Sequence, residues 1–128
     1  YDCFHAAQGM PYDLVADIGG RLIKVQVKTT LRARNIPQRK TPTPAYCFRI
    51  RHGKGAWHNY APGEVDLFAM VCIEDRLIGY IAPSNLPGTF YIRTEQHRGK
   101  HRVQDAGFYM KDMTLAKAMN LPATALEA

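Results

Sequence analysis

A glycine pair inside an apolar stretch is the feature that constrains the fold most. Residues 11–30 are rich in Val, Ile and Leu, and Gly19 and Gly20 stand in the middle of them. Two consecutive glycines accept the positive φ angles of a tight hairpin turn, which most residues avoid. The stretch is therefore expected to form two antiparallel strands joined by this turn.

The second of these strands divides its side chains between two faces. Because side chains alternate along a strand, Val25 and Val27 on the core side would place Lys24, Gln26 and Lys28 together on the other side. Two interpretations stay open. The polar face is functional, or its lysines are solvated charges that protect a sheet edge from aggregation.

The partner strand begins with an acidic residue, Asp13. Cross-strand pairing would bring its carboxylate close to Gln26 and Lys28. A hard divalent cation such as Mg²⁺ takes oxygen ligands and usually only one or two protein carboxylates, and a neighbouring lysine is able to orient the attacking water. Asp13, Gln26 and Lys28 are therefore the candidate residues of a hydrolytic magnesium site.

These residues resemble a known signature. Pro11–Asp13, followed after the glycine turn by Gln26–Lys28, resembles the PD-(D/E)XK nuclease motif with glutamine in place of the second acid. The Val-Gln-Val-Lys-Thr-Thr run is most similar to the intron-encoded homing endonuclease branch of that superfamily. The resemblance is strong over residues 11–30 and weaker at residues 65–69.

The resemblance implies a magnesium-dependent DNA endonuclease. In that family pattern Asp13, Gln26 and the carbonyl of Val27 would bind Mg²⁺, and Lys28 would position the water that attacks phosphorus. Each site would cut one strand, so a double-strand break implies a homo-oligomer.

The chain departs from the family pattern in two ways. Glutamine gives the metal a neutral oxygen, which leaves the site one charge short. The family usually carries an acidic residue on a helix before the first strand, and this chain begins at Tyr1 without such a helix. We therefore expect residues 1–128 to be a single nuclease domain, trimmed so that it lacks its N-terminal helix.

The charge of the chain favours a polyanionic partner, here double-stranded DNA. The net charge is +6 and the sequence pI is about 9.4. Residues 31–44 combine cations with a density of prolines that no helix or inner strand tolerates, which predicts a basic loop that clamps phosphates or is simply solvated. The residues predicted to contact DNA are Arg32, Arg34, Arg39, Lys40, Arg49, Arg51, Lys54 and Trp57. Trp57 would stack on a base or, alternatively, cover the edge of the core.

Cysteine usage indicates a reducing compartment. The three cysteines, Cys3, Cys47 and Cys72, form no CxxC pair and lie in apolar, strand-like segments, which predicts buried thiols. No apolar run approaches the length of a membrane span, so no membrane partner is expected. We expect a cytoplasmic protein that meets DNA at the nucleoid, of prokaryotic or phage origin.

Local patterns predict the remaining elements. Strands are expected over residues 1–7, 46–51, 67–73, 77–82 and 89–93, and a short helix over residues 112–120. Residues 67–73 should form a central strand buried on both faces. Asp66 is expected to cap a helical turn, or else to support the site from behind. His97 and His101 fit a basic loop better than a zinc site, because Gly99 interrupts a helix there.

The predicted fold class is α/β, with a restriction-endonuclease-like, mixed and largely antiparallel sheet and few helices. The predicted function is a DNA endonuclease, and a site-specific homing-type enzyme is the favoured form. Two alternatives remain open. One is a Holliday-junction resolvase or repair nuclease with the same site, and the other is an inactive DNA-binding module of the same fold.

Overall fold

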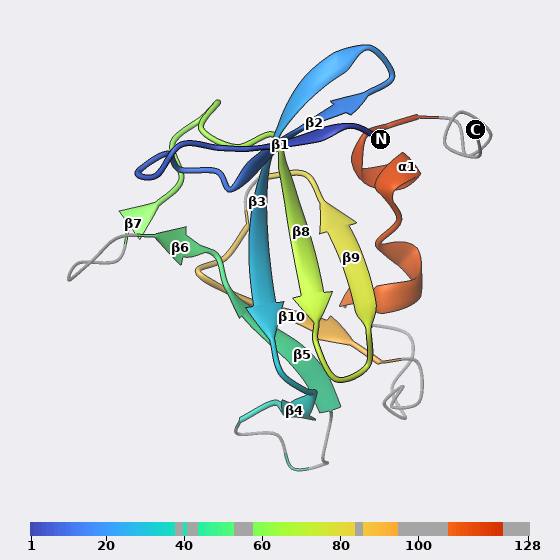
Figure 1. The fold of residues 1–128 in the computed structure, drawn as a ribbon. Helices are drawn as coiled ribbons and strands as arrows, with labels where there is room; N and C mark the ends of the chain where they lie inside the picture. Colours follow the sequence, from blue (N-terminus) through green and yellow to red (C-terminus); the bar gives the residue numbers. More distant parts are fainter. Residues whose placement is uncertain (38–39, 41–43, 53–57, 84–85, 95–107, 122–128) are drawn as a thin grey trace.

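The structure is a computed structural model that describes residues 1–37, 40, 44–52, 58–83, 86–94 and 108–121. Its strands are β1 (Cys3–His5), β2 (Leu14–Ile18), β3 (Arg21–Thr30), β4 (Arg34–Asn35), β5 (Pro44–Arg49), β6 (Arg51–His52), β7 (His58–Asn59), β8 (Leu67–Cys72), β9 (Leu77–Ile81), β10 (Thr89–Arg93) and β11 (Phe108–Tyr109). A 3-10 helix, η3 (Met110–Asp112), and an α-helix, α1 (Leu115–Ala118), follow them (Figure 1). The predictions for Arg39, Lys54, Trp57, His97 and His101 fall outside the described residues.

The strands form two sheets and one separate pair. The first sheet has the order β1-β2-β3-β8-β9 and is antiparallel except between β3 and β8. The second has the order β11-β10-β5-β4 and is antiparallel except between β10 and β11. β6 and β7 pair with each other, and β5 and β10 cross behind β3 and β8 in Figure 1. This arrangement confirms the predicted mixed, largely antiparallel fold with little helix.

The predicted hairpin is confirmed. Leu14 pairs with Val25 and Ile18 pairs with Arg21, so β2 and β3 are antiparallel strands joined by the two glycines. Gly19 has a φ of 60° and Gly20 a φ of 79°, which are the positive values that the turn required. The glycine pair therefore fixes the register that later brings Asp13 to the edge of β3.

The central position of β8 is also confirmed. Phe68 and Met70 belong to the core between the two sheets, together with side chains of β5 and β10. Leu67 and Ala69 belong to a second core on the opposite face, where α1 covers the first sheet. Since β8 is buried on both faces, its near-continuous apolar sequence is what this position requires.

The helix at the end of the chain forms within the predicted residues 112–120 but is shorter, Leu115–Ala118. Thr114 is its N-cap, with a side chain that accepts a hydrogen bond from the Lys117 amide at 3.2 Å. Asn120 follows the helix with a φ of 55°, a left-handed conformation that ends it. Leu115 and Met119 pack against the second core, so the apolar stripe of this helix is core, as predicted. No helix in the described part of the chain is long and apolar enough to cross a membrane.

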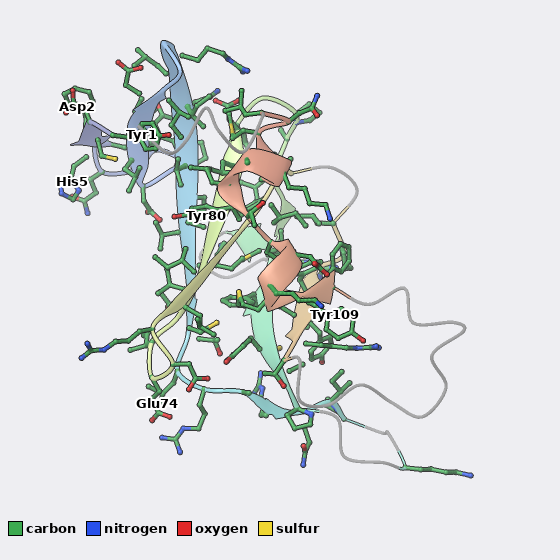
Figure 2. The ribbon with its side chains drawn as sticks, turned by 90° about the vertical axis from the view of Figure 1, so that its right-hand side faces the viewer. Tyr1, Asp2, His5, Glu74, Tyr80 and Tyr109 are labelled. Atoms are coloured by element: carbon green, nitrogen blue, oxygen red, sulfur yellow. The ribbon has the colours of Figure 1, made fainter. Side chains whose placement is uncertain are left out.

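The prediction that all three thiols are buried is wrong for Cys3. That residue is exposed on β1, the edge strand of the first sheet, whose three residues are all exposed. Cys47 is partly exposed and only Cys72 is fully buried. A strand-like pattern therefore did not reveal that the residues of β1 are exposed. Figure 2 shows Tyr1, Asp2 and His5 projecting from this edge, at the end of the molecule opposite Glu74.

The prediction that Asp66 caps a helical turn is also wrong. Strand β8 follows it directly, and its carboxylate accepts a hydrogen bond from the Lys24 amide at 2.9 Å. The Asp66 amide in turn donates to the Lys24 carbonyl at 2.9 Å. Asp66 therefore closes the start of the β3–β8 ladder, where an apolar residue would leave a partly buried amide without its acceptor.

Replacement of Asp66 tests this role. Asp66→Ala should lower the free energy of unfolding by about 1–3 kcal/mol, because it leaves the Lys24 amide unsatisfied. Asp66→Asn keeps an acceptor oxygen and should lose less. The matched control is Asp17→Ala on the exposed side of β2, which removes the same charge and should change stability by less than about 0.5 kcal/mol. Urea denaturation measures all three, and equal losses in Asp66→Ala and Asp17→Ala would contradict the assignment.

Candidate active site and basic groove

Asp13 lies where β2 separates from β3. Its amide donates to the Val25 carbonyl at 2.9 Å, and its carboxylate oxygen Oδ2 accepts from the Val27 amide at 2.9 Å. The Asp13 carboxylate thus accepts the β3 hydrogen bond that a backbone carbonyl would accept if β2 extended further along β3. Because the N–H and C=O of one strand residue point to the same side, the Val27 carbonyl shares this edge with the Asp13 carboxylate.

Lys28 is half-buried on the face of β3 that looks toward the second sheet. It pairs laterally with Met70 of the inter-sheet core. Its Nζ donates to the Arg51 carbonyl at 3.4 Å and lies 5.2 Å from the centre of the Tyr60 ring. Burial lowers the pKa of Lys28, and the nearby negative charge of Asp13 opposes part of that shift.

Lys24, four residues before Lys28 on the same face of β3, has a similar environment. Its Nζ donates to the Gly63 carbonyl and lies 5.9 Å from the centre of the Tyr12 ring. Since β3 is an inner strand and both lysines are half-buried with partners, the alternative of solvated edge lysines is wrong. The alternation prediction is confirmed: Val25 is buried in the second core, Val27 packs against it, and Lys24, Gln26 and Lys28 are on the opposite face.

Tyr60 is a site residue that the sequence did not reveal. Its ring meets Phe68 edge-on, with centroids 5.3 Å apart and planes at 74°, so it is held by the core. Burial, and then the negative charges of Asp13 and Glu64, raise the pKa of Tyr60 to about 12. Its hydroxyl therefore stays neutral at physiological pH, and its ring offers Lys28 a face without competing charge.

The donor set around Asp13 suits a hard cation. It consists of the Asp13 carboxylate and the Val27 carbonyl on one edge of β3, and Gln26 is the strand residue directly before Val27. Such oxygen donors match what Mg²⁺ selects, with water completing the shell. Within the described ranges no group of three or more His, Cys, Asp or Glu side chains is placed to hold a metal.

A basic groove continues from Lys28 away from Asp13. Its volume is about 690 Å³, and it lies between the end of β3, the segment that follows it, and β5 with β6. The cations that line it are Lys28, Arg32, Arg34, Arg49 and Arg51. The structure therefore gathers four of the arginines predicted to contact DNA beside Lys28. Lys40 is exposed and does not line this groove.

One wall of the groove carries an acid that the sequence did not single out. Glu74, in the turn between β8 and β9, accepts from Arg32 at 2.8 Å. The Glu74 amide also donates to the Leu31 carbonyl at 3.0 Å, which fixes the turn beside the end of β3. The side chains of Arg32 and Glu74 are 63% and 47% exposed, so this ion pair orients the arginine more than it stabilises the fold.

Comparison with solved structures shows a bacterial homing endonuclease, I-Ssp6803I, with a similar fold. The two share 17% sequence identity with a TM-score of 0.61, over 98% of this chain and 82% of that protein. At this level of identity the similarity concerns the fold. A search among curated proteins found no match.

Comparison with protein families gives a match over most of the chain. The family described as PD-(D/E)XK endonuclease matches residues 5–111, which include Asp13, Gln26 and Lys28. This confirms the resemblance drawn from the sequence motif. The chain belongs to the PD-(D/E)XK endonuclease family.

Proposed function

We propose that this protein is a Mg²⁺-dependent endonuclease that hydrolyses phosphodiester bonds in double-stranded DNA. One observation carries the proposal: the Asp13 carboxylate, fixed by the Val27 amide, lies near enough to act electrostatically on the half-buried Lys28, at the start of a groove lined by arginines. An oxygen site for a cation, an ammonium and a phosphate-binding surface are the three parts that metal-assisted phosphodiester hydrolysis needs.

Asp13, Gln26 and the Val27 carbonyl would hold the metal. When bound, Mg²⁺ would polarise the scissile phosphate and make a water more acidic. Asp13 is suited to this role because one carboxylate oxygen is tied to the Val27 amide, which fixes the orientation of the group. The same contact keeps the carboxylate beside Lys28, where it supports the charged form of the lysine.

Lys28 would orient the attacking water and stabilise the charge that develops on the phosphate. An ammonium has three N–H donors, and one is directed at the Arg51 carbonyl. The Tyr60 ring covers another side of Nζ without accepting a full hydrogen bond. The remaining donors are then available to the water and to a phosphate oxygen.

The groove arginines would hold the DNA backbone, and the similarity to a homing endonuclease supports a site-specific enzyme of that type. Because one such site cuts one strand, a double-strand break would need two copies, so a homo-oligomer is part of the proposal. We place the activity in the cytoplasm. The second candidate is an inactive DNA-binding module of the same fold, which the neutral amide of Gln26 in place of the second acid of the motif favours.

Variants of the three site residues test the chemistry. Asp13→Asn and Lys28→Ala should each abolish Mg²⁺-dependent nicking of plasmid DNA, while duplex binding in Ca²⁺ stays within a few-fold of the parent. Asn keeps an oxygen for the Val27 amide, so the loss isolates the charge. Gln26→Ala should lose far more activity than Gln26→Glu, which retains an oxygen ligand.

Asp17→Asn is the matched control, since this exposed residue lies on β2, three residues after Leu14, which pairs with Val25. It should cut like the parent. Nicking by Asp13→Asn and Lys28→Ala at the parental rate would show that the site is wrong. A parent that binds DNA but never nicks it would favour the inactive binding module.

Binding of any duplex should depend steeply on salt. Each phosphate contact in the groove should add about one unit to the slope of log affinity against log salt concentration. Arg34→Ala should weaken target and unrelated DNA equally, because a phosphate contact carries no sequence information. Fluorescence anisotropy across a salt series measures this, and a flat response would exclude phosphate-led binding.

The rate of cleavage should fall at alkaline pH as Lys28 loses its proton. Because burial lowers the pKa of Lys28, this alkaline limb of the pH–rate profile should lie below the pH at which an ordinary lysine titrates. Tyr60→Leu removes the ring that favours the ammonium and should move the limb to still lower pH, whereas Tyr60→Phe keeps the ring and should not. Single-turnover rates across a pH series decide it, and identical profiles for the Leu and Phe variants would contradict the role of the ring.

A further inference from the structure

A second, smaller cavity lies beside the basic groove. It has a volume of about 160 Å³ and is lined by Arg49, Arg51, Gly88 and Thr89. Arg49 and Arg51 line both this cavity and the groove, so the two spaces adjoin. A water in the liquid occupies about 30 Å³, which means that the cavity has room for a group of several heavy atoms.

The sheet places three polar side chains around this cavity. Arg49 pairs directly with Thr89 of β10, and directly opposed residues of an antiparallel pair project from the same face. Arg51 lies two residues after Arg49, on the same side of the extended chain, while Ile50 between them is buried in the core. Two guanidinium groups and one hydroxyl therefore share one small space.

Gly88 makes room for the side chain of Arg51. A methyl group added at Gly88 would lie 2.7 Å from Cζ and Nη2 of Arg51 and closer still to Nε. The guanidinium thus rests directly against the glycine backbone, and a larger residue at this position would have to displace it. The Gly88 carbonyl accepts from the Ile50 amide at 2.9 Å, which fixes the glycine next to this arginine.

Arg51 also connects the cavity to Lys28. Its carbonyl accepts the hydrogen bond from Lys28 Nζ at 3.4 Å, and its side chain reaches the small cavity. A group bound by the guanidinium would therefore constrain the same residue that orients the ammonium.

We propose that Arg49, Arg51 and Thr89, with the space left by Gly88, form a phosphate-binding subsite that holds a backbone phosphate of the nucleic acid next to the one at Lys28. The paired guanidinium forks match the oxygens of a phosphate, and none of the four lining residues is acidic. Continuity with the basic groove identifies the occupant as the nucleic-acid backbone. The proposal rests on the proposed function and adds Gly88 as a residue that positions Arg51.

Gly88→Ala is the decisive variant, because it displaces the guanidinium without changing any charge. Gly88 has an ordinary backbone conformation, so alanine brings no φ strain. In Ca²⁺ the salt slope of duplex binding should fall by about one unit, as it should for Arg51→Ala. The double variant should bind no more weakly than Arg51→Ala alone, because both changes remove the same contact.

Two controls separate this effect from charge loss and from misfolding. Arg21→Ala removes an exposed arginine at the far end of β3 and should leave the slope nearer that of the parent. Arg51→Ala keeps Gly88 intact, so it reports on the subsite even if Gly88→Ala does not fold. An unchanged slope in Arg51→Ala, or in a folded Gly88→Ala, would overturn the subsite.

A titration with inorganic phosphate at constant ionic strength tests the subsite without DNA. The NMR signal of the Arg51 Nε–H should shift on addition of phosphate in the parent and lose this response in Gly88→Ala. A response in a parent that binds no DNA would support the subsite while the proposed function fails. Normal cleavage by a parent whose Arg51 signal never responds would overturn the subsite and leave the proposed function intact.

Discussion

The parallel pairing of β3 with β8 is the constraint on which the rest of the structure depends. Antiparallel neighbours can be joined by a tight turn, but parallel neighbours need a long crossover between them. Here the chain between Thr30 and Leu67 forms that crossover and supplies β4 to β7. The crossover carries the groove arginines, the Arg51 carbonyl and Tyr60 back to Lys28, so the pairing that completes the sheet also assembles the candidate site.

Those parts of the fold that follow from local sequence were predictable. The glycine pair gave the β2–β3 turn, the apolar run gave β8, and residues 89–93 form β10 with the predicted bounds. The partners of Lys28 were not predictable, because both are distant in the sequence. The Arg51 carbonyl lies 23 residues after Lys28, and Tyr60 follows later in the same crossover. The predictions for Cys3 and Asp66 were wrong for the same reason. The exposure of Cys3 and the hydrogen bond from the Lys24 amide to Asp66 depend on tertiary contacts, which local periodicity does not reveal.

Asp13 shows how one side chain serves both the sheet and the site. Directly before β2 begins, its pairing with β3 stops; the Val27 amide needs an acceptor there, and the Asp13 carboxylate supplies it. The same negative charge partly offsets the desolvation of Lys28, whose burial would otherwise favour the neutral amine more strongly. A half-buried lysine is acceptable here because it also meets a carbonyl and an aromatic face. The site is therefore built from contacts that strand pairing already required.

Two cations of the groove, Lys28 and Arg51, are held by uncharged groups. Lys28 is oriented by an uncharged carbonyl and ring, and Arg51 rests against the bare backbone of Gly88. Arg32 is paired with an acid, Glu74, and the side chains of both partners are well exposed to water. Such a surface pair contributes little free energy, so a phosphate is able to displace Glu74 without a large penalty. The fold thus fixes the directions of Lys28 and Arg51 through neutral contacts, which leave the positive charge of these two side chains in place.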